Sequence, residues 1–460
     1  MIIIVGAGIT GLSAAFELVT RGIPFQILEA SPRAGGLIRT DRMDGFVIEA
    51  GPESVLAQKP AALDLCEALG LTPRLISTNH PRTAFVLKRG KLHPLPSPSV
   101  LGVPTTLGGI AQYGLLSPVA RARLALEIAV PRRRGDDDES IGSFFRRRFG
   151  NETVGLVAEP LLGGIHAGDI ETLSMKSLFP RLVEAEARSG SVLRAFRGAP
   201  RASAAGDGLF RTLAGGMGEL IEALERKLPA GSIRYESPVA AIAKDAATGE
   251  RGWQVRTTRG NLAADGVILA APAYVVAGIL SGVDAEVARR CAEVPYASTG
   301  SVALAWPREA VHHPLRGSGF VVARRYNDVR ITACTWVSSK WTGRAPAGSV
   351  LLRAFIGSAQ DPSAVDLSDE EMVDTVVRDL APLLGIAGRP SLATVARWRR
   401  AGAQHTVGQI ARVAAIDARL AAHGGLFVAG SGFRSVGIPD CIADGRAAAA
   451  RASEWTKIRS

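Results

Sequence analysis

The residues most suited to chemistry begin at the N-terminus, where the run GAGITG spans residues 6–11. It lies between a short apolar run at 2–5 and a segment with helical potential at 12–20. In this G-x-G-x-x-G pattern the first glycine allows a sharp turn, the second lets the backbone approach a pyrophosphate, and the third lets the helix pack closely on the strand. Glu29 ends a second apolar run at 24–28, where a carboxylate accepts hydrogen bonds from ribose hydroxyls. The pattern predicts a dinucleotide site made by the residues Gly6, Gly8, Ile9, Thr10, Gly11, Glu29 and Ala30.

Later features decide between the dinucleotides. An acid at Glu29 leaves no evident arginine for a 2′-phosphate, so NADP is disfavoured while NAD and FAD remain. Gly35 and Gly36 provide a second close approach of the backbone, which a nicotinamide enzyme does not need. Near the C-terminus, an apolar run ends at Gly430 and a glycine turn with a helix start follows at 437–440. The N-terminus of that helix could face the flavin N1 and O2 region, where negative charge develops on reduction. These features favour FAD.

The remaining reactive residue types form no catalytic constellation. No Ser-His-Asp order and no metal-ligand cluster stands out. The four cysteines lie far apart without a C-x-x-C pair, which disfavours a zinc site and a disulfide framework and fits a reducing compartment. A lone histidine such as His166 is more often a packed or exposed residue than a catalyst. We therefore name no catalytic residue and no metal ligand.

The elements that must position these residues are spread along the whole chain. With 460 residues, the chain has room for two or three sub-domains and a large core. Further strands for the dinucleotide sheet are predicted at 232–242, 253–258, 266–271 and 426–429, and an alanine-rich helix at 441–453. We therefore expect an α/β fold with a Rossmann-type FAD-binding domain that is discontinuous in sequence.

Two other segments differ from this domain in composition. From about 101 to 186 the chain is rich in Leu, Ala, Gly and Arg at helical spacing, which predicts a helical insertion. Between 296 and 400, short β-rich runs and a helix near 368–384 predict a second, mixed sheet that carries the substrate wall. The expected bounds are 1–80, 205–285 and 415–460 for the FAD-binding domain, 81–100 and 286–414 for the substrate-binding domain, and 101–204 for the helical domain.

Composition and charge narrow the setting. Hydrophobic residues make up 47% and charged residues 21%, as in ordinary globular proteins. The net charge of +11 favours anionic partners. Aromatic residues make up 5% and do not alternate with basic ones, so nucleic acid is not an expected partner. No signal peptide precedes the first apolar run, and no segment reaches the roughly 20 apolar residues of a spanning helix, so we expect a cytoplasmic protein.

A stretch from 100 to 134 could contact a membrane surface. Its apolar residues Leu101, Val103, Leu107, Ile110, Leu115 and Leu116 precede a basic run at Arg132–Arg134. This combination suits anionic lipid head groups with an apolar face beneath, and would place the protein peripherally on the inner face of the membrane. The alternative is a core helix with a solvated basic end.

With these residues in view, the sequence resembles the flavin-containing amine oxidase superfamily, and more narrowly the oxygen-dependent protoporphyrinogen oxidases. The resemblance covers nearly the whole chain. Beyond the glycine turn and Gly35-Gly36 it rests on GGIHAGDIETLSMKSLFP at 163–180, GGMG at 215–218 and VAGSGFRSVGIPDCIADG at 428–445. It implies FAD-binding, substrate and membrane-associating parts, and it adds to the FAD site Gly51, Val239, Val436, Gly437 and Ile438.

The chain departs from these relatives at two places. Leu37 stands where many relatives have arginine after the glycine pair, so a flavin-side cation must come from elsewhere, with Arg39 as a candidate. No arginine follows Leu95-Pro96, where the plant- and human-type enzymes have one that pairs with a substrate propionate. Cations that could replace it near the substrate wall are Lys88, Arg89 and Lys91.

The resemblance implies oxidation of a porphyrinogen by hydride transfer to FAD, with oxygen as acceptor and hydrogen peroxide as by-product. We expect protoporphyrinogen IX as the substrate, in the biosynthesis of haem. The alternative is coproporphyrinogen III, which carries propionates where the first has vinyls. An amine oxidase-type flavoenzyme and a non-enzymatic FAD-binding scaffold are less favoured, and a homodimer remains open.

Overall fold

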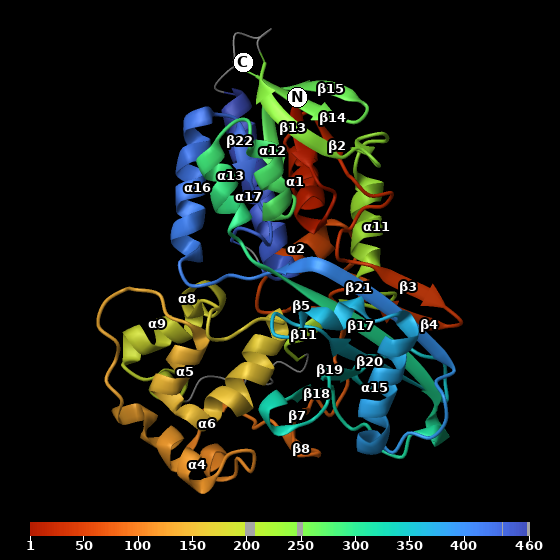
Figure 1. Cartoon of the computed structure of the whole chain (residues 1–460). Helices are drawn as coiled ribbons and strands as arrows, with labels where there is room; N and C mark the ends of the chain where they lie inside the picture. The colour runs from red at the N-terminus through yellow and green to blue at the C-terminus, as the bar shows by residue number, and fades with distance from the viewer. Residues whose placement is uncertain (198–207, 246–251, 435, 458–460) are drawn as a thin grey trace.

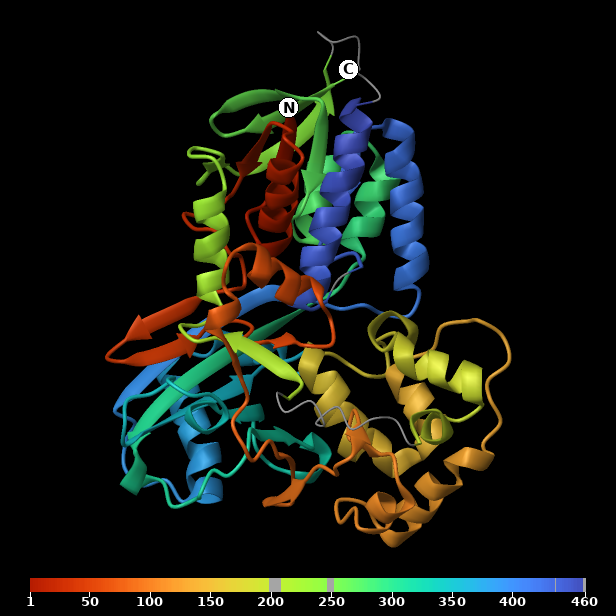
Figure 2. The ribbon, with the colours of Figure 1, turned by 180° about the vertical axis from the view of Figure 1, so that it is seen from behind.

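The structure is a computed structural model of the chain and describes residues 1–197, 208–245, 252–434 and 436–457. Figure 1 shows three bodies: a parallel sheet covered by helices at the top, a seven-stranded sheet below it on one side, and a group of helices below it on the other. The same arrangement is seen from behind in Figure 2. The expected fold class is confirmed: an α/β protein with a Rossmann-type sheet, a mixed second sheet and a helical insertion.

The upper body is built on five parallel strands in the order β12-β2-β1-β16-β22. Most of these strands are short apolar runs, which is typical of strands covered on both faces. Along β1, Ile2 and Ile4 pack into one layer, whereas Ile3 and Val5 pack into the other. The strands span β1 (Ile2–Val5), β2 (Phe25–Leu28), β12 (Ile233–Arg234), β16 (Gly266–Leu269) and β22 (Leu426–Val428).

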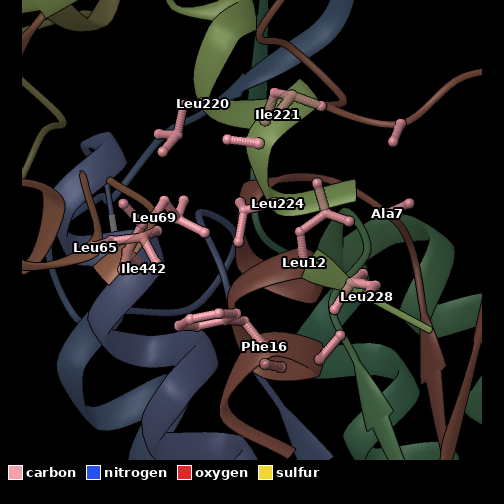
Figure 3. Close-up of a cluster of buried hydrophobic side chains, with 14 of the residues drawn as sticks. Ala7, Leu12, Phe16, Leu65, Leu69, Leu220, Ile221, Leu224, Leu228 and Ile442 are labelled. Atoms are coloured by element: carbon pink, nitrogen blue, oxygen red, sulfur yellow. The ribbon is translucent and has the colours of Figure 1, made fainter. Parts of the chain in front are cut away.

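Helices cover both faces of this sheet. Figure 3 shows one layer, in which Leu12 and Phe16 of α1 pack with Leu65 of α2, Leu224 of α11 and Ile442 of α17. The opposite layer contains α12, α13, α16 and a separate sheet, β13-β14-β15. These elements span α1 (Ile9–Thr20), α2 (Ala61–Ala68), α11 (Gly218–Lys227), α12 (Ala273–Leu280), α13 (Ala285–Ala292), α16 (Gln409–His423), α17 (Ile438–Lys457), β13 (Val239–Lys244), β14 (Trp253–Thr257) and β15 (Gly260–Ala264).

The single strand expected at 232–242 is two strands in the structure. Its first residues form β12 in the parallel sheet, and its last residues form β13 in the antiparallel sheet. The chain turns between them, where Glu236 has a positive φ of 49° and Pro238 has no backbone N–H to donate. The strand expected at 253–258 also belongs to the antiparallel sheet, as β14.

The second sheet has the order β21-β17-β20-β19-β18-β7-β8 and is mixed, because β18 and β7 run parallel while the other pairs are antiparallel. Helix α15 packs on it, beginning at a capping box between Ser368 and Glu371. The elements span β7 (Ala84–Lys88), β8 (Lys91–Pro94), β17 (Tyr296–Pro307), β18 (Gly319–Val322), β19 (Ile331–Trp336), α14 (Val337–Lys340), β20 (Ser349–Ile356), α15 (Asp369–Leu384) and β21 (Leu392–Ala403).

The helical body follows the strand pair β9 (Ser99–Val100) and β10 (Val103–Pro104). Its centre contains a π-helix at Val154–Gly163, a wide-turn form that is rare in proteins. Arg148 and Glu127 form a fully buried ion pair in this body. Its other helices are α3 (Leu107–Ala111), α4 (Pro118–Ala125), a 3-10 turn at Leu126–Ala129, α5 (Ile141–Phe149), α6 (Asn151–Thr153), α7 (Gly164–His166), α8 (Met175–Leu178), α9 (Pro180–Ser189) and α10 (Val192–Phe196).

The apolar stretch considered for membrane contact lies mainly inside this body. Val103, Ile110, Leu115 and Leu116 are buried in its core, whereas Leu107 is 65% exposed. The core alternative therefore describes most of these side chains. Among the described residues, no helix combines the length and the apolar character that crossing a membrane requires.

Short hairpins and connections join the three bodies. The hairpin β3–β4 extends from the upper body across the seven-stranded sheet in both views. A three-stranded sheet in the order β5-β11-β6 lies nearby. The remaining elements span β3 (Thr40–Met43), β4 (Phe46–Glu49), β5 (Val55–Leu56), β6 (Leu75–Ser77), β11 (Phe210–Leu213) and 3-10 turns at Thr72–Arg74, Arg308–Ala310, Arg324–Tyr326 and Pro362–Asp366.

Two expected domain bounds coincide with helices. Residue 415 falls inside α16 and residue 285 is the first of α13. Both helices pack whole in the same layer of the upper body, on the face of the parallel sheet that α12 also covers. The chain therefore leaves the upper body after α13 and returns to it before α16. The bound expected between 204 and 205 lies outside the described residues.

Candidate cofactor site

The three glycines of the N-terminal turn are required for three different reasons. Gly6 has a φ of +101°, and a Cβ there would lie 2.7 Å from the carbonyl oxygen of Ala270. A Cβ at Gly11 would lie 1.9 Å from the carbonyl oxygen of Gly6, so α1 could not pack on β1. A Cβ at Gly8 would meet no atom of the protein within 4 Å. Gly8 therefore borders open space, as expected where a pyrophosphate approaches the backbone.

Glu29 lies beside this turn at the carboxyl end of β2. Its Oε2 accepts a hydrogen bond from the Ala7 N–H at 2.7 Å, and its Oε1 accepts one from the Ser31 N–H at 2.8 Å. The carboxylate is thereby fixed at the edge where ribose hydroxyls are expected. The Ser237 N–H donates to the Glu29 carbonyl at 2.8 Å, which brings the start of β13, and so the predicted residue Val239, toward the same edge. Ala30 is exposed there.

The glycine pair at 35–36 lies directly against the turn. Gly35 donates its N–H to the Ala7 carbonyl at 2.8 Å, and a Cβ on Gly36 would lie 3.3 Å from the Cα of Gly8. Both glycines have positive φ angles, +96° and +57°, which favour glycine over other residues. The second close approach predicted from the sequence therefore lies next to the first.

Arg33 holds the carbonyls of this glycine segment. Its guanidinium donates to the carbonyl oxygens of Ala34 at 3.0 Å, Ile38 at 3.2 Å and Gly36 at 2.6 Å. Burial, followed by the nearby charge of Arg39, lowers the pKa of Arg33. Arg33 is not among the residues predicted for the site, and its only signal in the sequence is an arginine two positions before the glycine pair.

Gly51 and Leu37 form the next part of the site. A Cβ on Gly51 would lie 1.7 Å from the Leu37 carbonyl oxygen, so only glycine fits at this contact. The Leu37 side chain is 40% exposed, an unusual position for leucine beside a polar turn. Arg39 donates to Asp41 at 2.9 Å and its guanidinium lies 6.0 Å from the centre of the Trp398 ring. A cation is therefore present near this segment even though residue 37 is not arginine.

The C-terminal turn joins the first turn from the other side. Gly430, with a φ of +110°, donates its N–H to Asp444 at 2.8 Å and packs against the side chain of Thr10. A Cβ on Gly445 of α17 would lie 2.2 Å from the Thr10 carbonyl oxygen, so α17 and α1 cross in close contact. Helix α17 begins at Ile438, and the half-buried residues Val436 and Gly437 precede it. The positive end of α17 therefore lies at this turn, where it would stabilise an anion or a reduced flavin.

The structure thus brings the predicted residues to one edge of the parallel sheet. Both glycine turns, Glu29 and the 35–36 segment follow the carboxyl ends of β1, β2 and β22, which is where ligands of open α/β sheets bind. The open space at Gly8, the glycine-only contacts and the positive helix end fit a dinucleotide whose pyrophosphate lies against the first turn.

Two histidines, His166 and His405, have pKa values that are lowered mainly by burial, although His166 is only half-buried. Burial lowers the pKa of His166 to about 4, and its ring meets Phe179 edge-on. His405 bonds the Ser177 hydroxyl at 3.0 Å and the Ser431 carbonyl at 2.8 Å. It therefore ties the helical body to the C-terminal turn, a role with no signal in the sequence. All four cysteines are buried with free thiols, and no metal-ligand cluster occurs among the described residues.

Comparisons with known proteins place this chain in a family. The model of the family described as flavin containing amine oxidoreductase matches residues 9–453, which include the end of the first glycine turn and the whole C-terminal turn. The chain belongs to this family. The likeness extends over nearly the full length of individual relatives as well.

Coproporphyrinogen III oxidase of Bacillus subtilis (strain 168) is 37% identical over 97% of this chain and 96% of its own length. Chloroplastic protoporphyrinogen oxidase 1 of Spinacia oleracea is 29% identical over 96% of this chain and 82% of its own length. A crystal structure from Exiguobacterium sp. 255-15, provisionally assigned as a protoporphyrinogen oxidase, has a TM-score of 0.88 at 33% identity and covers 98% of each chain.

These findings confirm the expected family, the FAD cofactor and an FAD-dependent oxidase. When bound, FAD accepts hydride from the substrate and passes the electrons on. The chain's own residues supply the binding, the orientation and the dry surroundings.

Proposed function

We propose that this enzyme oxidises coproporphyrinogen III to coproporphyrin III, with oxygen as acceptor and hydrogen peroxide as by-product. The observation that supports this most is its 37% identity, over 97% of the chain, to a Bacillus subtilis protein named coproporphyrinogen III oxidase. From the sequence alone, protoporphyrinogen IX is the expected substrate. The relatives support its alternative better, since the spinach protoporphyrinogen oxidase is 29% identical.

The charge of the chain agrees with this choice. Coproporphyrinogen III has four carboxylates and protoporphyrinogen IX has two, and each buried carboxylate needs a cation or several hydrogen bonds. The net charge of +11 favours the more anionic of the two.

The predicted carboxylate partners lie at the edge of the seven-stranded sheet, in the hairpin formed by β7 and β8. Lys88, Arg89 and Lys91 lie at the turn between β7 and β8, away from the glycine turns (Figure 1). Lys88 donates to the Leu115 carbonyl at 2.8 Å, and its Nζ lies 5.6 Å from the centre of the Tyr326 ring. These contacts tie the hairpin to the helical body, so we propose no propionate partner at this turn.

In this proposal the three bodies bind different parts of the reacting system. The upper body binds FAD through the residues Gly6, Gly8, Ile9, Thr10, Gly11, Glu29, Ala30, Gly35, Gly36, Gly51, Val239, Gly430, Val436, Gly437 and Ile438. The seven-stranded sheet and the helical body enclose the macrocycle. No protein base is assigned, because the electron-rich pyrroles beside each methylene bridge stabilise the positive charge that hydride loss leaves.

Anaerobic mixing tests the substrate and cofactor together. Holoenzyme mixed with coproporphyrinogen III without oxygen should lose the yellow flavin absorbance within the turnover time, and should bleach more slowly with protoporphyrinogen IX. A flavin that stays oxidised with coproporphyrinogen III would contradict the proposal.

An oxygen electrode tests the acceptor. Oxygen uptake and hydrogen peroxide should both follow the formation of coproporphyrin III. Turnover without oxygen uptake, restored by an added quinone, would show another acceptor.

A further inference from the structure

The carbonyl oxygen of Ala50 lies where the end of the β3–β4 hairpin meets the seven-stranded sheet. It accepts hydrogen bonds from Ser301 Oγ at 3.1 Å, Arg353 Nη2 at 3.1 Å and Trp398 Nε1 at 2.7 Å. The three donors come from β17, β20 and β21, which are adjacent strands. A carbonyl oxygen has two lone pairs, so three side-chain donors fix its position more fully than ordinary packing requires.

The residues on either side of Ala50 are held in place too. Glu49 accepts hydrogen bonds from the Met217 N–H at 2.6 Å and the Thr40 hydroxyl at 2.7 Å. Glu53 forms an ion pair with Lys340 of α14. The bend at 50–52 is therefore fixed at both ends, and its central carbonyl is fixed by the sheet.

An unbroken series of backbone contacts connects this bend to the first glycine turn. Gly51 packs on the Leu37 carbonyl so closely that a Cβ would lie 1.7 Å away. Leu37 follows Gly36, whose Cβ position is 3.3 Å from the Cα of Gly8. A displacement of Ala50 would therefore displace the 35–38 segment, and with it the first glycine turn at Gly8.

Trp398 has two contacts with this region. Its indole N–H donates to the Ala50 carbonyl, and the centre of its ring lies 6.0 Å from the guanidinium carbon of Arg39. The Arg39 carbonyl in turn accepts a hydrogen bond from the Ala50 N–H at 2.9 Å. The pairing of β21 with β17 becomes irregular directly after Trp398, where the register passes from Thr299↔Trp398 to Ala297↔Gly402. Arg400, inside this irregularity, has a φ of +48°. Such bulges redirect side chains and occur often beside active sites.

We propose that Trp398, with Ser301 and Arg353, is a positioning residue that sets the Ala50–Gly51 bend, and through it the 35–39 segment, against FAD. The proposal rests on the FAD placement given above. It assigns the seven-stranded sheet a second task besides forming the substrate wall, namely to fix the flavin environment.

The competing explanation is that Trp398 only stabilises the sheet. Trp306 provides a matched control, because it lies in β17 of the same sheet and its indole N–H donates to a backbone carbonyl, that of Gly388, at 3.3 Å. Gly388 has no contact with the described residues of the cofactor turns, and Trp306 is fully buried whereas Trp398 is half-buried, so a purely structural loss should be at least as large at Trp306.

The experiment compares holoenzyme with the variants Trp398→Phe, Ser301→Ala and Trp306→Phe. The measurements are the FAD content, the visible spectrum and midpoint potential of the bound flavin, and the anaerobic rate of flavin reduction. Trp398→Phe should retain FAD, shift the flavin bands and potential, and slow flavin reduction about tenfold with little change in KM, the scale of one lost hydrogen bond. Ser301→Ala should shift the same quantities in the same direction by less, and Trp306→Phe should shift none.

Equal spectra, potentials and rates for Trp398→Phe and Trp306→Phe would overturn the proposal. If Trp398→Phe does not fold, Ser301→Ala decides, since it removes only a hydroxyl, and an unshifted flavin in that variant would count against the positioning role. Failure of the proposed function has a different signature, because wild-type enzyme would then hold FAD but not be reduced by coproporphyrinogen III, while the spectral comparison would still apply.

Discussion

At position 8 of the first turn, glycine is needed for cofactor binding and not for folding. Its φ of −68° suits every amino acid, and no protein atom lies within 4 Å of its Cβ position. Gly6 and Gly11, by contrast, are required by the backbone and by helix packing. A side chain at position 8 should therefore affect the ligand and leave the fold intact.

We predict that Gly8→Val abolishes FAD retention while the unfolding temperature of the apoprotein changes little. Gly278→Val is the control, because Gly278 of α12 likewise has no neighbour within 4 Å of its Cβ position. The FAD-to-protein absorbance ratio and the thermal unfolding of the apoprotein are the measurements. A yellow Gly8→Val protein with full flavin content would refute the assigned pyrophosphate approach.

Glu29 gives a second prediction at this scale. Both of its carboxylate oxygens accept hydrogen bonds from backbone N–H groups, those of Ala7 and Ser31. In Glu29→Gln, the side-chain NH₂ group would replace one of these oxygens and would face a backbone N–H, so that one hydrogen bond would be lost. The ribose edge should therefore be displaced, and the Kd for FAD should rise about tenfold, the usual cost of one charge-assisted hydrogen bond. Flavin fluorescence during titration of apoprotein measures this, and an unchanged Kd would show that Glu29 does not face the ribose.

At the scale of elements, the sequence predicts the helices and strands whose formation depends on local residue patterns. The first βαβ unit, α15 and α17 follow from apolar spacing and glycine position, and they occur close to the expected bounds. Strand β21 is not predicted, because Arg397, Trp398 and Arg399 interrupt its alternation, and only the neighbouring strand β17 makes it a strand. Arg33 and His405 act through contacts formed by folding, so neither spacing nor composition identifies them.

The crossing of α13 and α16 supports a prediction about pH. Asp284 caps α13 by accepting the N–H groups of Glu286 and Val287, and it pairs with Arg419 and His423 of α16. Burial alone would raise the pKa of Asp284, but the hydrogen bonds from His423, Val287 and Arg419 lower it well below its ordinary value.

Because the folded-state pKa is lowered, this stabilisation is present above the unfolded pKa of about 4 and is lost as the pH falls below it. Asp284→Ala should therefore reduce the free energy of unfolding by about 1–2 kcal/mol at pH 7, the range for a lost N-cap, and by less at low pH. Urea unfolding of the wild type and the variant, at pH 7 and at a pH below about 4, measures the two losses of free energy of unfolding. A loss that is equal at both would contradict the linkage.

Membrane contact is an untested prediction at the scale of elements, and the exposed apolar side chains that could make it differ in part from the predicted ones. The exposed apolar side chains of the helical body include Leu107, Val119, Leu126 and Ile128, with Val119 79% and Leu126 61% exposed. If this surface lies on a membrane, Val119→Ser with Leu126→Ser should reduce flotation with anionic vesicles, because apolar burial drives insertion at the interface. Ile410→Ser, on α16 of the upper body, is the control, and flotation unchanged by the double substitution would exclude this surface.

At the scale of the whole molecule, the reaction depends on how three bodies meet. The parallel sheet presents both glycine turns, the β3–β4 hairpin extends over the seven-stranded sheet, and His405 joins the helical body to the C-terminal turn. The porphyrinogen-oxidase family is established by the comparisons, and the choice of macrocycle is the central claim of the proposed function.

Competition between the two porphyrinogens in one vessel tests that claim most directly. Equal concentrations of coproporphyrinogen III and protoporphyrinogen IX, mixed with a limiting amount of holoenzyme, yield the ratio of kcat/KM as the ratio of the two initial rates of product formation. Coproporphyrin III should form at least about tenfold faster, the factor that one better-paired carboxylate provides. Equal rates, or faster formation of protoporphyrin IX, would contradict the account.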